Sequence, residues 1–207
     1  YQIKAIEDIF SAFKKADSVM LQMPTGTGKT VVFTSFVRRW QLDFERNKRI
    51  LFIVHRTELV DQIIQHLNQS GIHQVNRIQG KVRHEDLVNV QVHVGTVQTL
   101  RNLSNLPKNL SLIVIDEAHH TPAASYEKIL EAYSQFKGLK VLGVTATPQR
   151  LSGEGFSRFF NELILSDPIK KFLEDGFLAR TRHFVTSVPE LAHLKLRNGD
   201  YLEKESE

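Results

Sequence analysis

Short apolar runs alternate with amphipathic stretches along most of the chain. Helical spacing near the start predicts an opening helix with its apolar face at Ile3, Ile6, Ile9, Phe10 and Phe13. β-rich apolar runs predict strands at 19–23, 49–54, 90–94, 111–115 and 139–144. The stretches between them predict helices at 29–40, 57–69, 96–102 and 122–133. This alternation is typical of an α/β fold, a mostly parallel sheet with helices on both faces and ligands at the carboxyl edge of its strands.

The turn after the first predicted strand carries a phosphate-binding pattern. Its candidate residues are Pro24, Thr25, Gly26, Thr27, Gly28, Lys29 and Thr30. Glycines permit positive φ, so successive backbone N–H groups can curl around an anion at the start of a helix. Lys29 is then placed to reach the β- and γ-phosphates, and Thr30 to offer its hydroxyl to Mg²⁺. The chain therefore handles a nucleoside triphosphate in this interpretation, with ATP and Mg²⁺ as cofactors.

One position of this pattern departs from the strict P-loop. Met23 stands where G-x-x-x-x-G-K-[ST] has its first glycine. The alternative is a chance loop of Gly, Thr and Lys, which the flanking strand and helix disfavour because the mechanism demands both of them.

A pair of carboxylates follows the apolar run at 110–115. Asp116 and Glu117 lie at the end of that predicted strand, where side chains face the ligand crevice. Asp116 can hold magnesium through its water shell, and Glu117 can polarise the water that attacks the γ-phosphate. The alternative is an acidic helix start with Asp116 as its cap. The phosphate-binding pattern upstream favours the catalytic interpretation.

Composition narrows the class of protein further. The 207 residues suit one α/β domain, or one domain with an appendage, and 41% hydrophobic content is ample for a core. No apolar run approaches the ~20 residues that cross a bilayer, and no signal-peptide pattern appears, so we expect no membrane partner. The absence of cysteine rules out disulfides and thiolate metal sites, and is compatible with the cytoplasmic location that we expect. A net charge of +4 permits nucleic-acid binding without proving it.

Organisation changes after residue 148. Gly153-Glu154-Gly155 marks a loop, and the chain ends in a polar tail. We therefore predict one domain at 1–186 and an exit linker at 187–207. Upstream, aromatic residues at helical spacing are interpreted as core packing rather than base stacking; these are Phe33, Phe36, Trp40 and Phe44.

Taken together, the motifs resemble the first motor domain of superfamily 2 helicases. The box Asp116-Glu117-Ala118-His119 is similar to the DEAD/DEAH motif of that superfamily. Supporting stretches are Val54–Leu59, similar to motif Ia, Gly95–Leu100, similar to the next strand-end motif, and Thr145-Ala146-Thr147-Pro148, similar to motif III. Within the superfamily the chain looks most like the type III restriction-enzyme helicase subunits and the RadD- and XPB-like helicases. The resemblance implies a RecA-like P-loop NTPase domain.

The resemblance also implies roles for individual residues. Gln2 occupies the position at which a glutamine of the family pairs with adenine. An ordinary glutamine on a helix surface is an equal alternative for this residue. His119 is expected to link the ATP site to Thr145 and Thr147, which could instead form an ordinary turn. Arg56 and Thr96 follow strand ends and are expected to meet a nucleic-acid backbone, although each could be a local cap.

These implications define the expected function. The chain is expected to be the ATP-binding motor lobe of an ATP-dependent DNA helicase or translocase, with DNA favoured over RNA. Its partner is a second RecA-like domain of the same full-length protein, and the fragment alone is expected to hydrolyse ATP weakly. Two alternatives stay open: the motor subunit of a restriction nuclease, and a non-enzymatic ATP-gated nucleic-acid clamp.

Overall fold

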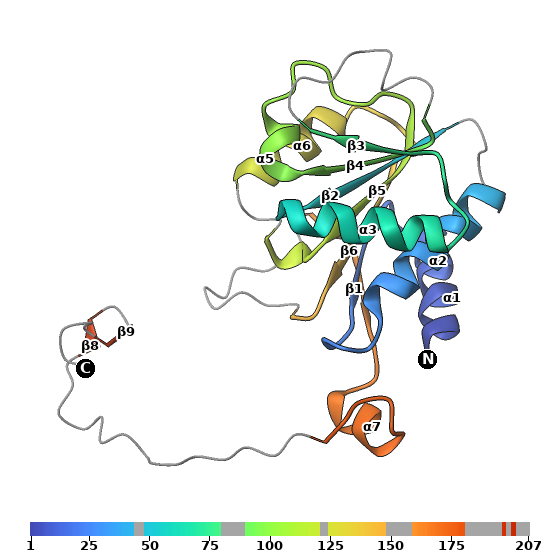
Figure 1. Ribbon diagram of the computed structural model, residues 1–207, viewed down its shortest axis with the longest axis vertical. Coiled ribbons are helices and arrows are strands. Elements are labelled where there is room, and N and C mark those ends of the chain that lie inside the picture. The colour runs from blue at the N-terminus through green and yellow to red at the C-terminus, as the bar shows by residue number, and fades with distance from the viewer. Residues whose placement is uncertain are drawn as a thin grey trace.

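A seven-stranded parallel sheet forms the centre of the molecule, in the order β3-β4-β2-β5-β6-β1-β7 (Figure 1). The computed structural model describes residues 1–43, 48–79, 90–120, 124–147 and 159–180, and the backbone of 196–197 and 200–201. The strands of the sheet are β1 (Ser18–Gln22), β2 (Arg49–Val54), β3 (Val75–Ile78), β4 (Val92–Thr96), β5 (Leu110–Asp116), β6 (Lys140–Thr145) and β7 (Glu162–Leu165). A short antiparallel pair, β8 (Leu196–Arg197) and β9 (Asp200–Tyr201), lies near the end of the chain.

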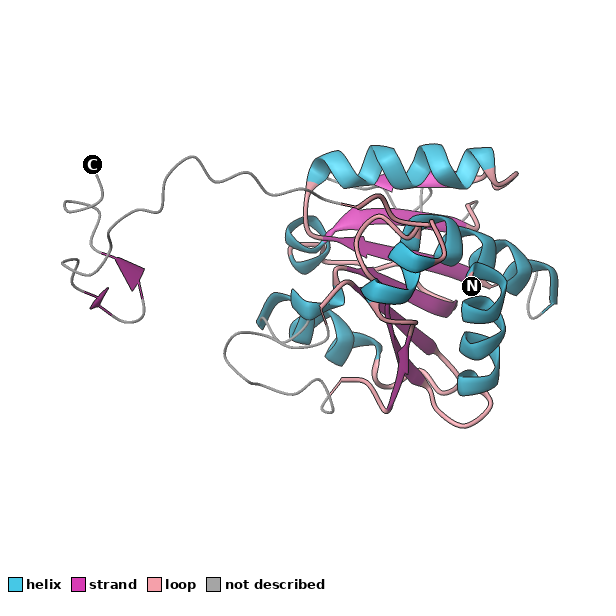
Figure 2. Cartoon of the chain, turned by 90° about the horizontal axis from the view of Figure 1, so that it is seen from below, coloured by secondary structure: helices cyan, strands magenta, loops and turns pink. Residues whose placement is uncertain are grey.

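Helices cover both faces of the sheet (Figure 2). They are α1 (Gln2–Phe13), α2 (Lys29–Asp43), α3 (Thr57–Gln69), α5 (Val97–Arg101), the 3₁₀ turn η1 (Ala118–His120), α6 (Ala124–Tyr133) and α7 (Ile169–Glu174). Side chains of α1, α2 and α3 share one buried cluster with one face of the strands, and those of α5 and α6 share a second cluster with the other. The predicted fold class, a parallel α/β sheet with helices on both faces, is confirmed.

The aromatic residues of α2 pack in the hydrophobic core. Phe33, Phe36 and Trp40 are almost completely buried, and the Trp40 indole N–H donates to the Ser111 hydroxyl at 3.1 Å. Full burial of such side chains stabilises the fold by about 1.5–3 kcal/mol each. The prediction of core packing is confirmed for these three residues, whereas Phe44 lies outside the described residues.

Several predicted bounds differ from the observed ones. The strand predicted at 90–94 is β4 at Val92–Thr96, because Gly95 and Thr96 still pair with β2. A Cβ at Gly95 would lie 3.1 Å from Ile78 and 3.3 Å from Leu100, so glycine fits this position. Strands β3 and β7 and helix α7 were not predicted, since they are short and only partly buried. The predicted start of the helix at 122–133 and the predicted domain boundary at 186 lie outside the described residues.

Gly143 offers a test of the packing between β6 and η1. A Cβ at this position would lie 2.5 Å from Phe160 Cζ and 2.8 Å from Ala118 Cβ. We expect Gly143→Ala to lower the free energy of unfolding by about 1–3 kcal/mol, the usual cost of overpacking. Chemical denaturation measures it. Adding Phe160→Leu, which removes the far end of the ring, should recover part of the loss; equal stability of the wild type and Gly143→Ala would contradict this packing.

No described helix is both long enough and apolar enough to span a membrane.

Candidate nucleotide-binding site

The phosphate-binding pattern forms the loop between β1 and α2. Gly26 and Gly28 adopt φ of +84° and +77°, the left-handed region that glycine tolerates. Inside the loop the Thr27 hydroxyl donates to the Pro24 carbonyl at 2.7 Å, and α2 begins at Lys29. The loop therefore has the strand–turn–helix context in which backbone N–H groups at a helix start hold an anion.

Met23 shows why the first glycine of the strict pattern is dispensable in this chain. Its side chain is fully buried in the core, and its backbone N–H donates to the Thr145 carbonyl at 2.9 Å. Position 23 therefore extends the ladder between β1 and β6, in a backbone conformation that does not need glycine.

Lys29 and Asp116 lie in the same site. The Lys29 ammonium donates to the Met23 carbonyl at 3.4 Å, which holds it over the loop. Burial raises the pKa of the Asp116 carboxyl to about 6, with a further rise from the charge of Glu117. The Glu117 backbone N–H and the positive charge of Lys29 oppose that rise in pKa. β1 and β5 both pair with β6, with Gln22 opposite Thr145 and Asp116 opposite Val144, so the two sequence motifs lie at the same edge of the sheet.

The backbone turns sharply at the carboxylate pair. Glu117 has a φ of +50°, which is uncommon for a residue with a side chain, and its N–H donates to Asp116 Oδ1 at 3.0 Å. The Asp116 carboxylate thus accepts from the very next residue rather than from the second or third N–H of a helix, and the chain continues into the 3₁₀ turn η1. This geometry is not that of an N-terminal helix cap.

A chain of polar contacts joins the Glu117 carboxylate to β6. His119 Nδ1 lies 3.2 Å from Glu117 Oε2 and 3.0 Å from the Thr145 hydroxyl. The Thr145 hydroxyl donates to the Thr147 carbonyl at 2.9 Å and accepts from the Thr147 N–H at 3.2 Å. Contacts therefore run without a gap from Glu117 to Thr147. Pro148, the last residue of that motif, lies outside the described residues.

One member of this arrangement was missed in the sequence. The Gln22 side-chain amide at the end of β1 donates to the Ala146 carbonyl at 3.0 Å, which ties the strand before the phosphate loop to the segment 145–147. The available signal was a polar residue closing an otherwise apolar strand.

The predicted adenine-reading residue lies against the phosphate loop. Gln2 Nε2 donates to the Thr27 carbonyl at 3.4 Å and lies 2.5 Å from where a Cβ on Gly28 would be. Gln2 is thus not a free helix-surface residue.

The two predicted nucleic-acid residues differ in their surroundings. Arg56 and Thr96 lie at the carboxyl ends of the neighbouring strands β2 and β4, as expected. Arg56 is exposed and makes no side-chain cap. The Thr96 side chain is buried, and its hydroxyl accepts from the Thr99 N–H at 3.2 Å as the cap of α5. The local-cap alternative therefore describes Thr96 but not Arg56.

Histidines cluster beside the carboxylates. The His120 ring lies 4.1 Å from the His119 ring and 5.1 Å from the His55 ring, measured between centroids. Burial, together with the charge of Arg56, lowers the pKa of His55. Within the described parts of the chain, no group of three His, Asp or Glu residues is arranged to hold a metal ion.

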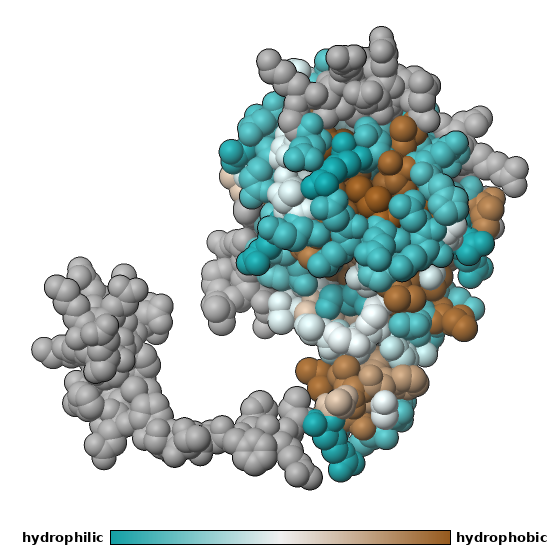
Figure 3. Space-filling model, viewed as in Figure 1, coloured by the Kyte–Doolittle hydropathy of each residue, from teal (hydrophilic) through white to brown (hydrophobic). Residues whose placement is uncertain are grey.

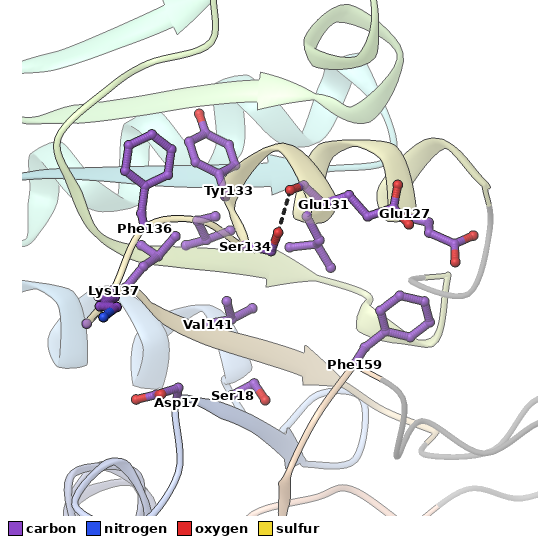
Figure 4. A pocket seen from close by; sticks show the side chains of 14 residues that line it. Asp17, Ser18, Glu127, Glu131, Tyr133, Ser134, Phe136, Lys137, Val141 and Phe159 are labelled. Atoms are coloured by element: carbon purple, nitrogen blue, oxygen red, sulfur yellow. Dashed lines mark hydrogen bonds between the residues drawn. The ribbon is translucent and has the colours of Figure 1, made fainter.

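A separate cavity of about 500 Å³ lies away from the phosphate loop, between α6 and the starts of β1 and β6 (Figure 4). Ser18 and Val141 line it from the strands, and Leu130 and Tyr133 from α6. Ser18 and Val141 lie near the amino ends of β1 and β6, whereas the phosphate loop follows the carboxyl end of β1 and Asp116 lies at the carboxyl end of β5. The cavity is therefore not the candidate nucleotide site.

An all-parallel sheet with a phosphate loop after β1, an Asp-Glu pair at the end of β5 and a histidine link to β6 is the arrangement of a RecA-like P-loop domain of the superfamily 2 helicase class. Comparison with known proteins identifies the family. Residues 1–150 match the family described as type III restriction enzyme, res subunit, and the chain belongs to it.

Relatives agree with this assignment, and a solved structure shares the fold. The chain is 33% identical over 182 residues to a 51.5 kDa protein of a Lactococcus phage, covering 88% of this chain and 36% of that protein. It is 28% identical to the putative mitochondrial ATP-dependent helicase irc3 of Schizosaccharomyces pombe, covering 88% of this chain and 31% of that protein. A nuclease-deletion mutant of the Type ISP restriction-modification enzyme LlaGI, solved with a DNA substrate mimic, shares the fold with a TM-score of 0.67. The two are 18% identical, over 86% of this chain and 20% of that one. The chain spans about a third of the length of the first two relatives.

Proposed function

We propose that the chain is the ATP-binding motor lobe of a DNA helicase or translocase. The observation that carries this proposal is the pairing of the strand ends: β1 and β5 both pair with β6, so Gln22, just before the phosphate loop, and Asp116 end at the same edge of the sheet. A cation beside an acidic metal ligand is the arrangement that Mg²⁺-dependent phosphoryl transfer requires. Membership of a helicase-containing family supports it.

Each residue of the site has a distinct task. The N–H groups of residues 26–30 bind the phosphates, and Lys29 neutralises their charge. Thr30 and Asp116 would hold Mg²⁺, which would supply stabilisation of the charge that develops on the phosphate oxygens. Glu117 orients the attacking water and receives its proton. His119 and Thr145 relay the state of this site to Thr147 through the hydrogen bonds that join the three residues.

Nucleic acid would be bound at the carboxyl ends of β2 and β4. The exposed guanidinium of Arg56 suits a phosphate contact, which makes binding salt-sensitive and largely independent of base sequence. Thr96 shapes this surface as the cap of α5, and its neighbour across the strands is Val54. DNA is favoured over RNA because one relative by fold was solved with a DNA substrate mimic.

Asp116 predicts a pH dependence of nucleotide binding. Its pKa in the folded protein is about 6, above the ordinary value of 3.8. The folded protein therefore binds this proton more tightly than the unfolded chain, and the free energy of unfolding falls as the pH rises from 3.8 to about 6. A metal ligand must be ionised, so the affinity for Mg·ATP should fall roughly tenfold per pH unit below about pH 6. Titration calorimetry between pH 5 and 8 measures it. Asp116→Asn, measured in parallel, reports the titration of the nucleotide's own phosphates, and identical pH profiles for the two proteins would contradict the role of Asp116.

A second candidate function is the motor subunit of a restriction nuclease. The family description and the fold relative both concern restriction enzymes. The same lobe would then pump DNA for a cleavage domain, so a nuclease domain in the full-length protein distinguishes the two. A non-enzymatic clamp is disfavoured because Lys29, Asp116 and Glu117 are all present.

An ATPase assay of the full-length protein tests the proposal. Single-stranded DNA, duplex DNA and RNA are added separately as activators. We expect DNA to stimulate hydrolysis, with a loss of stimulation as salt is raised. Stimulation by RNA alone would redirect the proposal to RNA, and hydrolysis unaffected by any nucleic acid would reject it.

A further inference from the structure

Helix α7 and the turn after it lie against the phosphate loop. Leu178 Cδ2 is 3.2 Å from where a Cβ on Gly26 would be, so there is room for glycine but little more. The turn is well defined, because the N–H groups of Phe177 and Leu178 both donate to the Phe172 carbonyl, at 2.9 and 3.0 Å. Gly176, with a φ of +76°, ends the helix in the manner of a C-terminal glycine cap. In Figure 1, α7 accordingly lies next to the loop after β1.

An aromatic cluster joins this turn to the start of the chain. The Tyr1 ring makes edge contacts with the rings of Phe172, at 4.9 Å, and Phe177, at 4.7 Å between centroids. Phe172 is buried, whereas Phe177 is 55% and Tyr1 37% exposed. Figure 3 shows apolar surface over α7, and Ile169 of this helix is also exposed. We call Tyr1, Phe172, Phe177 and Leu178 the α7 clasp.

The clasp reaches one peptide group of the phosphate loop. The Tyr1 hydroxyl donates to the Thr27 carbonyl at 3.0 Å, and Gln2 Nε2 donates to the same oxygen at 3.4 Å. In a planar trans peptide the C=O and the following N–H point in opposite directions. Fixing the Thr27 carbonyl toward Tyr1 therefore fixes the Gly28 N–H toward the opposite side.

We propose that Tyr1, seated by Phe172 and Phe177, is a positioning residue of the nucleotide site that holds the Thr27–Gly28 peptide with its N–H directed at the bound phosphates. This inference rests on the proposed function, since it needs the loop to bind a triphosphate. Without the clasp, this peptide has more conformational freedom, because Thr27 lies between two glycines, Gly26 and Gly28. Ordering it before binding reduces the entropy lost when the nucleotide binds. The clasp thus makes nucleotide affinity depend on α7.

Two substitutions in the full-length protein test the clasp. Tyr1→Phe keeps the ring and removes only the hydroxyl donor, and Phe177→Ala removes a half-exposed ring that supports Tyr1. Each should raise the dissociation constant of a fluorescent ATP analogue with Mg²⁺ by about 2- to 10-fold, the scale of one oriented hydrogen bond or one aromatic contact. Because Phe177 acts through Tyr1, the double variant should lose less than the product of the two single losses. Phe136→Ala, which removes a 41%-exposed ring after α6, is the matched control and should bind normally.

Hydrogen exchange distinguishes a positioning role of Tyr1 from a purely structural one. Coupling between two sites is reciprocal, so Mg²⁺ with the analogue should slow exchange of the Phe177 and Leu178 amides in the wild type. This protection should shrink in Tyr1→Phe. If the wild type binds no analogue, the proposed function and this inference both fail. If Lys29→Ala abolishes binding while Tyr1→Phe and Phe177→Ala bind as the wild type does, with no nucleotide-dependent protection of α7, the inference alone fails.

Discussion

A protein consisting of residues 1–180 is expected to bind Mg·ATP yet hydrolyse it about 10³–10⁵-fold more slowly than the full-length protein with DNA. That factor is the usual contribution of an arginine finger. The described lobe brings Lys29, Asp116 and Glu117 together, and we expect the finger to come from the second RecA-like domain that the resemblance to superfamily 2 helicases implies. Single-turnover hydrolysis measured beside nucleotide binding separates the two steps.

Robust DNA-stimulated turnover by residues 1–180 alone would contradict this expectation, because the lobe would then complete its own catalytic site. The control is Lys29→Ala in the same fragment, which should lose nucleotide binding because the cation facing the phosphates is removed. Normal circular dichroism of both proteins would establish that folding is not the cause.

Replacing Glu117 by glutamine should reduce ATP hydrolysis in the full-length protein by about 10²–10⁴-fold, the range found for loss of a general base. Glutamine keeps the length and the hydrogen-bonding oxygen but cannot take a proton. Nucleotide affinity should change little, because Glu117 acts on the water and not on the phosphates. Steady-state kinetics should therefore show a fall in kcat with KM nearly constant.

The environment of Glu117 adds a second expectation for the same variant. His119 Nδ1 lies 3.2 Å from its carboxylate and 3.0 Å from Thr145, so an amide at position 117 leaves the His119–Thr145 contact in place. DNA binding in the presence of a non-hydrolysable analogue should thus be retained. Unchanged hydrolysis by Glu117→Gln would exclude Glu117 as the group that positions the water.

Most of the fold was predictable because the strands that matter are buried on both faces. The runs at 49–54 and 111–115 are continuous and apolar, and they became β2 and the middle of β5. The Lys29 loop was predictable because its glycine, lysine and threonine residues stand between an apolar strand and a helix. By contrast, β7 has three of its four residues exposed, and α7 has only six residues, so neither presents a periodic apolar pattern.

Contacts between distant residues were the part that no local pattern could predict. Tyr1 and Phe172 are far apart in the sequence, and nothing in either neighbourhood indicates that their rings meet. The positive φ of Glu117 arises from the way the chain leaves β5, which residue types alone do not specify. For Thr96, a threonine that caps a helix and one that contacts a phosphate look the same in sequence, and only the structure shows the hydrogen bond that its hydroxyl accepts from the Thr99 N–H.

The central claim is that the loop at Lys29 and the carboxyl of Asp116 form one triphosphate site. A crystal structure of the full-length protein with Mg²⁺ and a non-hydrolysable ATP analogue tests it most directly. We predict the β- and γ-phosphates against the N–H groups of residues 26–30 and beside the Lys29 ammonium, with the metal ion between them and Asp116. An analogue bound elsewhere, or Lys29 and Asp116 facing separate cavities, would contradict it.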